Sequence, residues 1–386
     1  MFFLQAGDAA AAPVDVVLVE LGAAITLLAL LARLAARAGI SPIPLYLLGG
    51  LAFGHGGIVP LDAADDVLRV CSEIGAVLLL FMLGLSYTAK ELGESARGHL
   101  KSGLVDFALN APVGVIAGKI AGWPWSASLL MGGVTYVTSS GIASKLLADL
   151  KWTENPETTA VVSMLVLEDL ALAFLLPLLA IAAEGTEVNG VLKIVSSLAA
   201  VLIALYLALK AGPTMTGWLK HKSREVMLLT MFGAVLLVAG GSHRVGIAAT
   251  VGAFLLGLAV TGSVADQTRA LLAPLRDLFA ALFFFFFALR LDPHDLVPVL
   301  IPAAALAAVS GLTKVATGWL AAARESKSSK ARLRAGLVLI PRGEFSIVIA
   351  GLAVAMPNVG TVAAAYVLIT AMAGPLAIRI LSRRLT

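Results

Sequence analysis

The chain contains the stretch Met164-Leu165-Val166-Leu167-Glu168-Asp169-Leu170-Ala171-Leu172, in which two carboxylic acids stand side by side. They lie near the centre of an apolar run from about residue 158 to 183, which is long enough to cross a bilayer as one helix. An ionised acid at mid-membrane costs about 3 kcal/mol even on lenient insertion scales, and two neighbouring acids also repel each other. At neutral pH at least one of them should therefore be protonated, cation-bound or paired with a base. The stretch indicates a protein that binds and moves charge.

The composition indicates one integral membrane domain. Of the 386 residues, 59% are hydrophobic and 13% are charged, and the mean hydropathy is +0.96, whereas soluble domains are about 25% charged. This hydropathy excludes a soluble enzyme. The net charge of +4 comes from basic residues spread thinly between apolar runs, which are better interpreted as topology signals than as a nucleic-acid surface. The single cysteine, Cys71, excludes a disulfide framework.

Apolar segments recur along the chain with short connections between them, and we count about thirteen. They are approximately 14–36, 43–60, 70–88, 102–122, 124–148, 158–183, 190–210, 225–241, 245–263, 277–291, 297–321, 334–355 and 361–381. Most of the 28 Lys and Arg residues fall in alternate connections. Because such residues accumulate in the cytoplasm, we expect the N-terminus outside and the C-terminus in the cytoplasm.

Segments 5 and 12 carry polar and helix-weakening residues at membrane depth. Segment 5 contains Thr135-Tyr136-Val137-Thr138-Ser139-Ser140-Gly141, and segment 12 contains Pro341-Arg342-Gly343-Glu344-Phe345-Ser346. Non-helical backbone is tolerated there only where it is buried in protein or lines a cavity. If segments 1–6 and 8–13 are two repeats of opposite orientation, both are fifth members, and paired interrupted helices indicate the site of a transporter. We therefore predict an all-α membrane fold with inverted repeats and two crossed discontinuous helices.

Asp169 is the first candidate for an ion-binding residue. Burial beside Glu168 favours the neutral acid, so that a proton and a cation compete for one carboxylate. A neutral acid that only joins two helices by a hydrogen bond is the alternative. Glu168 is either a second ion ligand or the partner of a buried base, and Lys314 in segment 11 is the obvious base. We favour a Glu168–Lys314 pair; otherwise Lys314 stabilises carbonyl groups of segments 5 and 12.

The interruptions themselves supply further candidates. Thr138, Ser139 and Ser140 are expected to offer neutral oxygens to a dehydrated alkali cation, although small hydroxyl residues also permit close helix packing. Arg342 and Glu344 stand two residues apart and are predicted to compensate charge, either each other's or the partial charges at the ends of the broken helices.

Weaker signals lie outside these segments. Asp106 and Asn110 share a helix face at i, i+4, and we expect them to line a cytoplasmic funnel unless they serve packing. We expect Phe283–Phe287 to face lipid or the membrane interface. Gly50 and Gly54 form a GxxxG pattern, which permits close approach of another helix. The histidines lack metal-site spacing and the glycines form no phosphate-binding loop, so we expect no metal other than an alkali cation as cargo, no cofactor and no ATP hydrolysis.

Short motifs follow one another along the chain. They are Ser72-Glu73-Ile74-Gly75-Ala76-Val77-Leu78-Leu79-Leu80-Phe81-Met82-Leu83-Gly84-Leu85, Thr138-Ser139-Ser140-Gly141-Ile142, Glu168-Asp169, Lys314 and Arg342-Gly343-Glu344-Phe345. In this order and spacing they resemble the Kef-type monovalent cation:proton antiporters, over nearly the whole chain. The first looks like the family's third helix, the second is similar to its Ser-Ser-Thr-Ala crossing helix, and the last matches its Arg-Gly-Glu-Phe segment. Glu168 departs from the Gln, Asn or Asp that relatives carry before the aspartate.

The resemblance implies a sodium/proton antiporter-like fold and a homodimer. It implies an interface part at about 14–88 and 225–291, a mobile core part at about 102–183 and 297–381, and a linker helix at about 190–210. Asp169 would be the proton and cation carrier, moved by an elevator-like displacement. Kef proteins continue into a soluble nucleotide-binding domain, and this chain stops at Thr386. We therefore expect a separate cytosolic regulatory subunit.

Together these observations predict secondary-active exchange of a monovalent cation for protons across the bacterial cytoplasmic membrane, in pH homeostasis. Potassium is favoured by the resemblance alone, and a Na+/H+ antiporter is the alternative. A gated cation channel is a second class, which predicts conductance without a proton gradient. A sodium-coupled organic-anion symporter is a third class, which predicts substrate-dependent uptake. The expected partners are K+ or Na+, protons and the lipid bilayer, with no nucleic acid.

Overall fold

The computed structural model describes residues 13–38, 40–54, 65–85, 89–183, 223–244, 249–352 and 358–385. Regular secondary structure within these ranges is helical throughout, which confirms the predicted all-α class. The helices are α1 (Val14–Ala38), α2 (Ile43–Phe53), α3 (Asp65–Leu85), α4 (Ala89–Ile120), α5 (Trp125–Tyr136), α6 (Ser140–Asp149), α7 (Pro156–Ala183), α9 (Arg224–Arg244), α10 (Ala249–Ala259), α11 (Gly262–Leu289), α12 (Pro293–Ala321), α13 (Ser329–Val338), α14 (Glu344–Gly351) and α15 (Val359–Leu385). The segment expected at 190–210 lies outside the described residues.

Seven of the described helices are long and apolar enough to cross a membrane: α1, α3, α4, α9, α11, α12 and α15. Large apolar side chains point outward from them. Leu237 on α9 is 78% exposed, and Ile301 and Leu312 on α12 are 81% and 71% exposed. Such a surface suits hydrocarbon, because in water it would be an unfavourable apolar patch. The chain is therefore built to lie in a bilayer.

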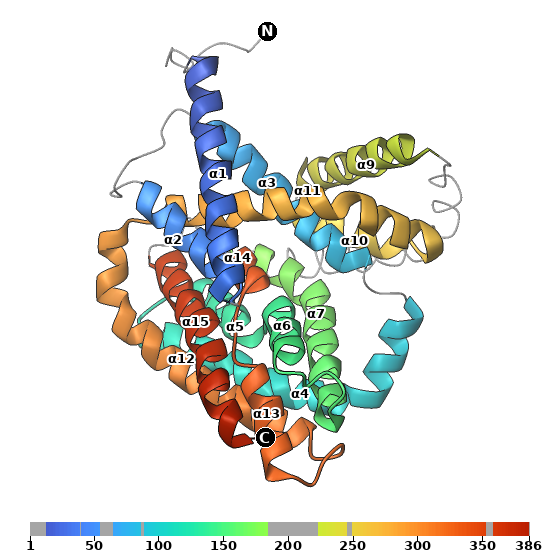
Figure 1. The fold of residues 1–386 in the computed structure, drawn as a ribbon, viewed down its shortest axis with the longest axis vertical. Helices are drawn as coiled ribbons and strands as arrows, with labels where there is room; N and C mark the ends of the chain where they lie inside the picture. Colours follow the sequence, from blue (N-terminus) through green and yellow to red (C-terminus); the bar gives the residue numbers. More distant parts are fainter. Residues whose placement is uncertain are drawn as a thin grey trace.

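The helices pack in two groups, which Figure 1 shows one above the other. In the first, α11 packs against α2, α3 and α9, and α10 packs against α3 and α9. In the second, α4 packs against α5, α7 and α12, while α15 packs against α12, α13 and α14. The groups meet where α2 contacts α15, α10 contacts α7 and α11 contacts α14. The fold thus leaves one long junction between two bundles.

Both predicted interruptions are present. Segment 5 consists of two half helices, α5 and α6, and the chain between Tyr136 and Ser140 is not helical. Segment 12 likewise consists of α13 and α14, with a break between Val338 and Glu344. Both breaks are buried, as the rule for non-helical backbone at membrane depth requires. The sequence therefore located the two discontinuous helices correctly.

Two helices begin more than ten residues earlier than the apolar pattern suggested. The predicted segment at 277–291 is the C-terminal half of α11, which starts at Gly262, and the segment at 102–122 belongs to α4, which starts at Ala89. Charged residues in these first turns resemble a polar connection in the sequence. In α11 the difference matters, because it turns Arg276 from a connection residue, and Asp277 from the first residue of a segment, into mid-helix residues.

The expectation that Phe283–Phe287 faces lipid is wrong. All five phenylalanines are at most 7% exposed, because α11 is enclosed by α2 and α3. Glycines bring the backbones together. A Cβ at Gly50 would lie 2.8 Å from Ala288 Cβ and overlap the carbonyl of Phe285, and one at Gly75 would overlap the carbonyl of Phe279. The glycines of the GxxxG pattern thus form the surface on which α11 packs. The five phenylalanines are buried inside the protein.

Candidate functional site

The two interrupted helices cross at their breaks. The backbone N–H of Ser139 donates to the carbonyl of Pro341 over 2.9 Å, which joins one break directly to the other. Ser346 Oγ donates to the carbonyl of Val134 over 3.0 Å. A Cβ at Gly343 would lie 2.5 Å from Ser139 Oγ, so glycine lets the two chains pass closely. These contacts fix the relative position of the four half helices.

Arg342 donates hydrogen bonds to carbonyl groups at the C-terminal ends of two half helices. Its Nη1 donates to the carbonyls of Leu339 and Ile340, over 2.9 and 2.7 Å, at the end of α13. Its Nη2 donates over 2.9 Å to the carbonyl of Thr135 at the end of α5. The side chain is fully buried. A buried cation therefore offsets the negative partial charges of two helix ends and satisfies carbonyls that the breaks leave without helical partners.

The N-terminal ends of the other two half helices carry the complementary groups. Ser139 is the N-cap of α6, and its Oγ accepts from the N–H of Ile142 over 3.3 Å. Glu344 is the first residue of α14, where an acid is favoured by the positive partial charge of a helix N-terminus. Arg342 therefore lies at helix ends with a negative partial charge, and Glu344 lies at a helix end with a positive one. This agrees with the expectation that the two residues compensate the partial charges of the broken helices.

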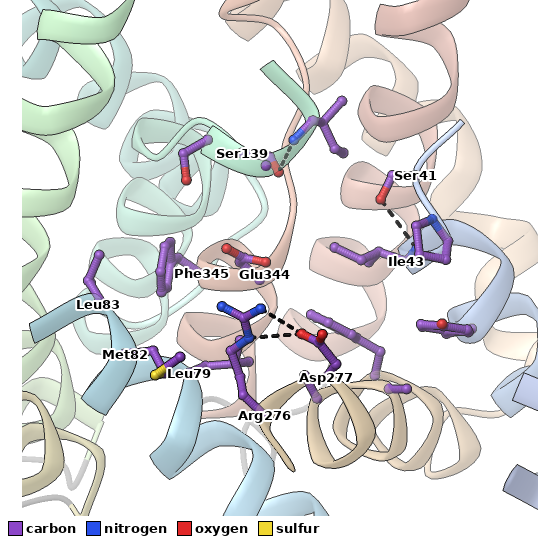
Figure 2. Close-up of a pocket in the computed structure, with 18 of the residues that line it drawn as sticks. Ser41, Ile43, Leu79, Met82, Leu83, Ser139, Arg276, Asp277, Glu344 and Phe345 are labelled. Atoms are coloured by element: carbon purple, nitrogen blue, oxygen red, sulfur yellow. Dashed lines mark hydrogen bonds and ion pairs between the residues drawn. The ribbon is translucent and has the colours of Figure 1, made fainter. Parts of the chain in front are cut away.

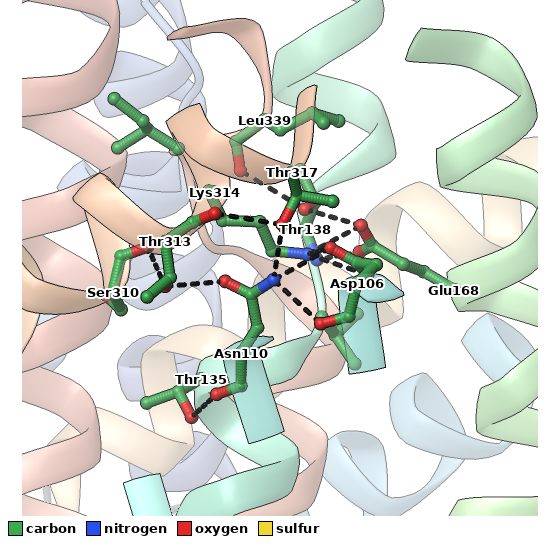
Figure 3. A network of polar contacts seen from close by, with 12 residues as sticks. Asp106, Asn110, Thr135, Thr138, Glu168, Ser310, Thr313, Lys314, Thr317 and Leu339 are labelled. Atoms are coloured by element: carbon green, nitrogen blue, oxygen red, sulfur yellow. Dashed lines mark hydrogen bonds and ion pairs between the residues drawn. The ribbon is translucent and has the colours of Figure 1, made fainter. Parts of the chain in front are cut away.

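A second set of polar side chains forms a buried network behind the crossing (Figure 3). Lys314 Nζ, from α12, lies 2.7 Å from Glu168 Oε1 on α7 and 2.9 Å from Asp106 Oδ1 on α4. Lys314 and Asp106 are 0% exposed and Glu168 is 1% exposed. The favoured Glu168–Lys314 contact is present in the structure, and Asp106 is a second carboxylate on the same ammonium. One buried cation thus ties three helices together.

Glu168 also reaches the break in segment 5. Its carboxylate accepts from the backbone N–H of Thr138 and, over 3.0 Å, from Thr138 Oγ1. The same hydroxyl lies 3.2 Å from the carbonyl of Leu339 in the other break. Glu168 therefore connects Lys314 to the crossing.

Asp106 and Asn110 do not line an open funnel in this structure, contrary to expectation. Both are 0% exposed. Asn110 Nδ2 donates to Asp106 Oδ1 over 2.9 Å and to Thr317 over 3.0 Å, and Thr313 donates to Asn110 Oδ1 over 2.8 Å. The i, i+4 face of α4 is turned toward α12, because Lys314 and the two threonines there supply the partners that these polar groups need once buried.

Asp169 faces a different environment from its neighbour. It lies in the wall of a cavity of about 630 Å³ and is 6% exposed. The cavity lies between the two helix groups (Figure 2), and its polar lining includes Ser41, Tyr46, Ser139, Ser140, Lys145, Asp169, Arg276, Asp277 and Glu344. Successive helix residues point about 100° apart. One acid of the pair therefore faces the cavity while the other faces the buried network.

The structure thus sorts the candidate residues into two places. Ser139, Ser140 and Glu344 line the cavity with Asp169, whereas Thr138, Glu168, Lys314 and Arg342 are buried around the crossing. Three charged cavity residues were not among the candidates predicted from the sequence. Arg276 Nε and Nη2 donate to Asp277 over 2.9 and 2.6 Å, and Figure 2 shows Glu344 facing this pair.

The third of these residues, Lys145, joins the two helix groups. Its Nζ, from α6, donates over 2.9 Å to the carbonyl of Ile40, between α1 and α2. In the sequence Lys145 and Arg276 counted only as topology signals, and no signal placed them at a cavity. Asp106, by contrast, was recognisable as a functional candidate from the sequence, because its i, i+4 spacing with Asn110 marks a polar face on an apolar helix.

Comparisons with known proteins agree with one another. The model of the family described as "Sodium/hydrogen exchanger, transmembrane" matches residues 23–384. The chain is 32% identical to the K(+)/H(+) antiporter subunit KhtU of Bacillus subtilis over 375 residues, covering 94% of this chain and 93% of the relative. It is 31% identical to the ammonium/H(+) antiporter subunit AmhT of Alkalihalophilus pseudofirmus, covering 87% of this chain and 85% of the relative.

A solved structure shares the fold. The sodium proton antiporter MjNhaP1 from Methanocaldococcus jannaschii superposes with a TM-score of 0.71 at 18% identity, covering 96% of this chain and 98% of the other. At that identity the likeness is one of fold alone. It extends over nearly the whole chain.

Proposed function

Because this chain belongs to the sodium/hydrogen exchanger family of transmembrane proteins, we propose that it exchanges a monovalent cation for protons across a membrane. The observation that supports this most directly is the position of Asp169, a carboxylate in the middle of an apolar helix and in the wall of a cavity beside two helix breaks. Potassium is the favoured cation, because the relative KhtU is named as a K(+)/H(+) antiporter subunit. The protein is a secondary transporter and not an enzyme.

Asp169 is the proposed carrier. Burial makes the ionised form of a carboxylate costly, so binding of a proton or of a cation is favoured at this site. A cation that arrives from the cavity displaces the proton, and a proton that returns displaces the cation. Ser139 and Ser140 line the same cavity and offer oxygen atoms to a partly dehydrated alkali ion. Competition for one acid couples the two fluxes without a further energy source.

Glu168 and Thr138 are proposed to hold this site in place from behind. The carboxylate of Glu168 forms an ion pair with Lys314 and accepts a hydrogen bond from Thr138. Because these contacts fix Glu168, they also orient the turn of α7 that carries Asp169. Lys314, Arg342 and Glu344 balance the charges of the buried network and of the four half-helix ends. Asp106 and Asn110 complete the charge balance around Lys314.

The two helix groups are proposed to be the parts that move relative to each other. Helices α1–α3 and α9–α11 would form the interface part of a homodimer, and α4–α7 with α12–α15 would form the mobile core that carries Asp169. The residues that line the cavity come from both groups, so a displacement between them changes access to Asp169. We further propose the cytoplasmic membrane of a bacterium, an external N-terminus, and a separate cytosolic regulatory subunit, in line with relatives that are named as subunits.

Ammonium is a second candidate cation. The relative AmhT is named as an ammonium/H(+) antiporter subunit and is almost as similar as KhtU. Ammonium carries the same charge as potassium and can also donate hydrogen bonds to serine oxygens such as those of Ser139 and Ser140. The cation series in the test must therefore include K+, Na+ and NH4+.

The test uses purified protein in liposomes with an imposed, acid-inside pH gradient and an internal pH dye. Addition of the transported cation to wild-type vesicles should dissipate the gradient, and Asp169→Asn should abolish the response. Asp266→Asn is the matched control, because Asp266 is an exposed residue of α11 that does not line the cavity. Exchange by Asp169→Asn at the wild-type rate would refute the proposal. Cation conductance without a proton gradient would favour the channel class instead.

A further inference from the structure

The cavity beside Asp169 carries more charged side chains than the proposed exchange uses. Its described lining also includes Glu344 and Lys145 from the core group and Arg276 and Asp277 from α11. The other lining residues are neutral, and most of them are apolar. When all five side chains are ionised, three acids and two bases leave one negative charge in excess. The formal charge of the cavity therefore matches one monovalent cation.

Arg276 lies beside the two acids that the proposed exchange does not use. Its Nε and Nη2 donate to Asp277 Oδ1 over 2.9 and 2.6 Å. Glu344, from α14 in the other helix group, faces this pair (Figure 2). The side chains of Arg276 and Asp277 are 34% and 67% exposed, so an ion in the cavity can reach them. Without the guanidinium, two carboxylates from different helix groups would face the same space.

Lys145 supplies the second positive charge of the lining. Its Nζ donates over 2.9 Å to the carbonyl of Ile40, which holds the ammonium at the wall of the cavity. A topology signal requires only that a basic residue lies on the cytoplasmic side of the membrane. It does not require that the side chain lines an ion cavity. The position of Lys145 and Arg276 therefore calls for a further explanation.

The balance of charge distinguishes monovalent from divalent cations. A proton or one monovalent cation brings the formal charge of the cavity to zero, whereas a divalent cation would leave a positive charge without compensation between apolar helices, which is unfavourable. Ca2+ and Mg2+ also prefer carboxylate oxygens as ligands. Arg276 already binds one carboxylate of the cavity, that of Asp277. Within the described ranges, no group of three or more acidic, histidine or cysteine side chains is placed to hold a metal ion.

We propose that Arg276, together with Lys145, sets the valence specificity of the exchanger, because these fixed charges admit one monovalent cation and exclude divalent cations. The proposal rests on the proposed exchange, since valence matters only if the transported ion enters this cavity. Arg276 is thus a specificity-determining residue that does not bind the transported ion. Its removal would free Asp277 and Glu344 to bind Mg2+ or Ca2+.

The first test measures binding without transport. Purified protein in detergent is unfolded by heat with and without millimolar MgCl2 or CaCl2, because a cation that binds the folded state raises the melting temperature. Arg276→Gln should melt several degrees higher with the divalent salt, and wild type should not shift. Arg276→Lys keeps the charge and should behave as wild type. Arg269→Gln is the matched control, because it removes the same charge from α11 at a residue that does not line the cavity.

The second test measures exchange. Liposomes with an acid-inside pH gradient receive K+ in the presence of millimolar Ca2+ on both sides of the membrane. Exchange by Arg276→Gln should fall several-fold and recover when Ca2+ is chelated, whereas wild type, Arg276→Lys and Arg269→Gln should be unaffected. If Arg276→Gln cannot be purified as a single species, Lys145→Gln decides by the same two comparisons, since it removes the other positive charge of the lining.

An Arg276→Gln variant that neither melts higher nor loses exchange in Ca2+ would overturn the proposal. Equal effects of the divalent salts on wild type or on Arg269→Gln would also overturn it, because the resident charge of the cavity would then not decide valence. Absence of cation-driven exchange by wild type would refute the proposed function. The melting measurement still decides whether Arg276 excludes divalent cations in that case, since it requires no transport.

Discussion

Lys314 Nζ lies 2.9 Å from Asp106 Oδ1, although the two residues are 208 positions apart in the sequence. The same ammonium lies 2.7 Å from Glu168 Oε1. Two buried carboxylates therefore depend on one buried cation. Removing one member of such a group leaves an uncompensated charge in a region without water, and this costs far more than the intact group contributes.

Replacing Lys314 should destabilise the protein strongly. Lys314→Met leaves Asp106 and Glu168 without their shared counterion, and the expected loss of unfolding free energy is about 3–5 kcal/mol. Thermal unfolding of the purified protein in detergent measures it. The combined variant Lys314→Met/Asp106→Asn/Glu168→Gln should recover most of the loss, because no buried charge remains. Lys330→Met, on the exposed face of α13, is the control. A combined variant no more stable than Lys314→Met would contradict this account.

The guanidinium of Arg342 should not be replaceable by an ammonium. Arg342 donates to three carbonyls at the ends of two half helices, and a lysine lacks the planar fork that reaches them together. Hydrogen bonds from a charged donor contribute about 1.5–3 kcal/mol each, so Arg342→Lys should lower stability by about 2 kcal/mol or more. Thermal unfolding beside the exposed control Arg324→Lys tests this. Equal melting temperatures would show that charge alone suffices at the crossing.

The close packing of α2 on α11 predicts opposite outcomes for two glycine substitutions. Gly50→Ala places a methyl group against the backbone of α11, and overpacking of this kind costs about 1–3 kcal/mol. Gly240→Ala on α9 meets nothing within 4 Å, and alanine there should stabilise the helix by up to about 1 kcal/mol. Both are measured by thermal unfolding in detergent. A neutral Gly50→Ala would mean that α11 can move away from α2.

Substitutions of the two adjacent acids of α7 should affect different properties: one should lower stability and the other should abolish transport. Glu168→Gln removes the charge that Lys314 and Thr138 bind, and should lower stability by about 1–3 kcal/mol. Asp169→Asn changes a side chain in the cavity wall and should stay within about 1 kcal/mol of wild type while abolishing exchange. Unfolding and liposome exchange are measured on both variants. A destabilised Asp169→Asn with intact exchange would reverse the proposed roles.

Features that depend on local chemistry were predicted well from the sequence. The breaks near Thr138 and Arg342 were recognisable because a membrane tolerates polar, helix-weakening residues at its centre only where the backbone is buried in protein or lines a cavity. The Glu168–Lys314 contact followed from the need of a buried acid for a base. The class and the family likewise followed from apolar segments and short motifs, which the match to the family model confirms.

Features that depend on helix rotation and helix extent were not predictable. An apolar helix has no polar face to show which side meets lipid and which meets protein, so Phe283–Phe287 was misplaced. The GxxxG pattern of Gly50 and Gly54 was a hint of its burial, because such a pattern permits close approach of another helix. Asp106 was expected to line a cytoplasmic funnel, with packing as the alternative, because nothing in α4 tells which way its polar face turns. Arg276 was assigned to a connection because charged first turns of α11 interrupt the hydropathy signal.

The half helices α6 and α14 both begin at the wall that carries Asp169. Each helix start bears roughly half a positive charge, so an arriving cation meets mild repulsion at the very place where it docks. The carboxylates of Glu344, at the start of α14, and of Asp169 line the same cavity and offset this repulsion. The attraction of the site for a cation thus depends on acids that outweigh two helix starts, and removing either acid would leave those starts to repel the ion.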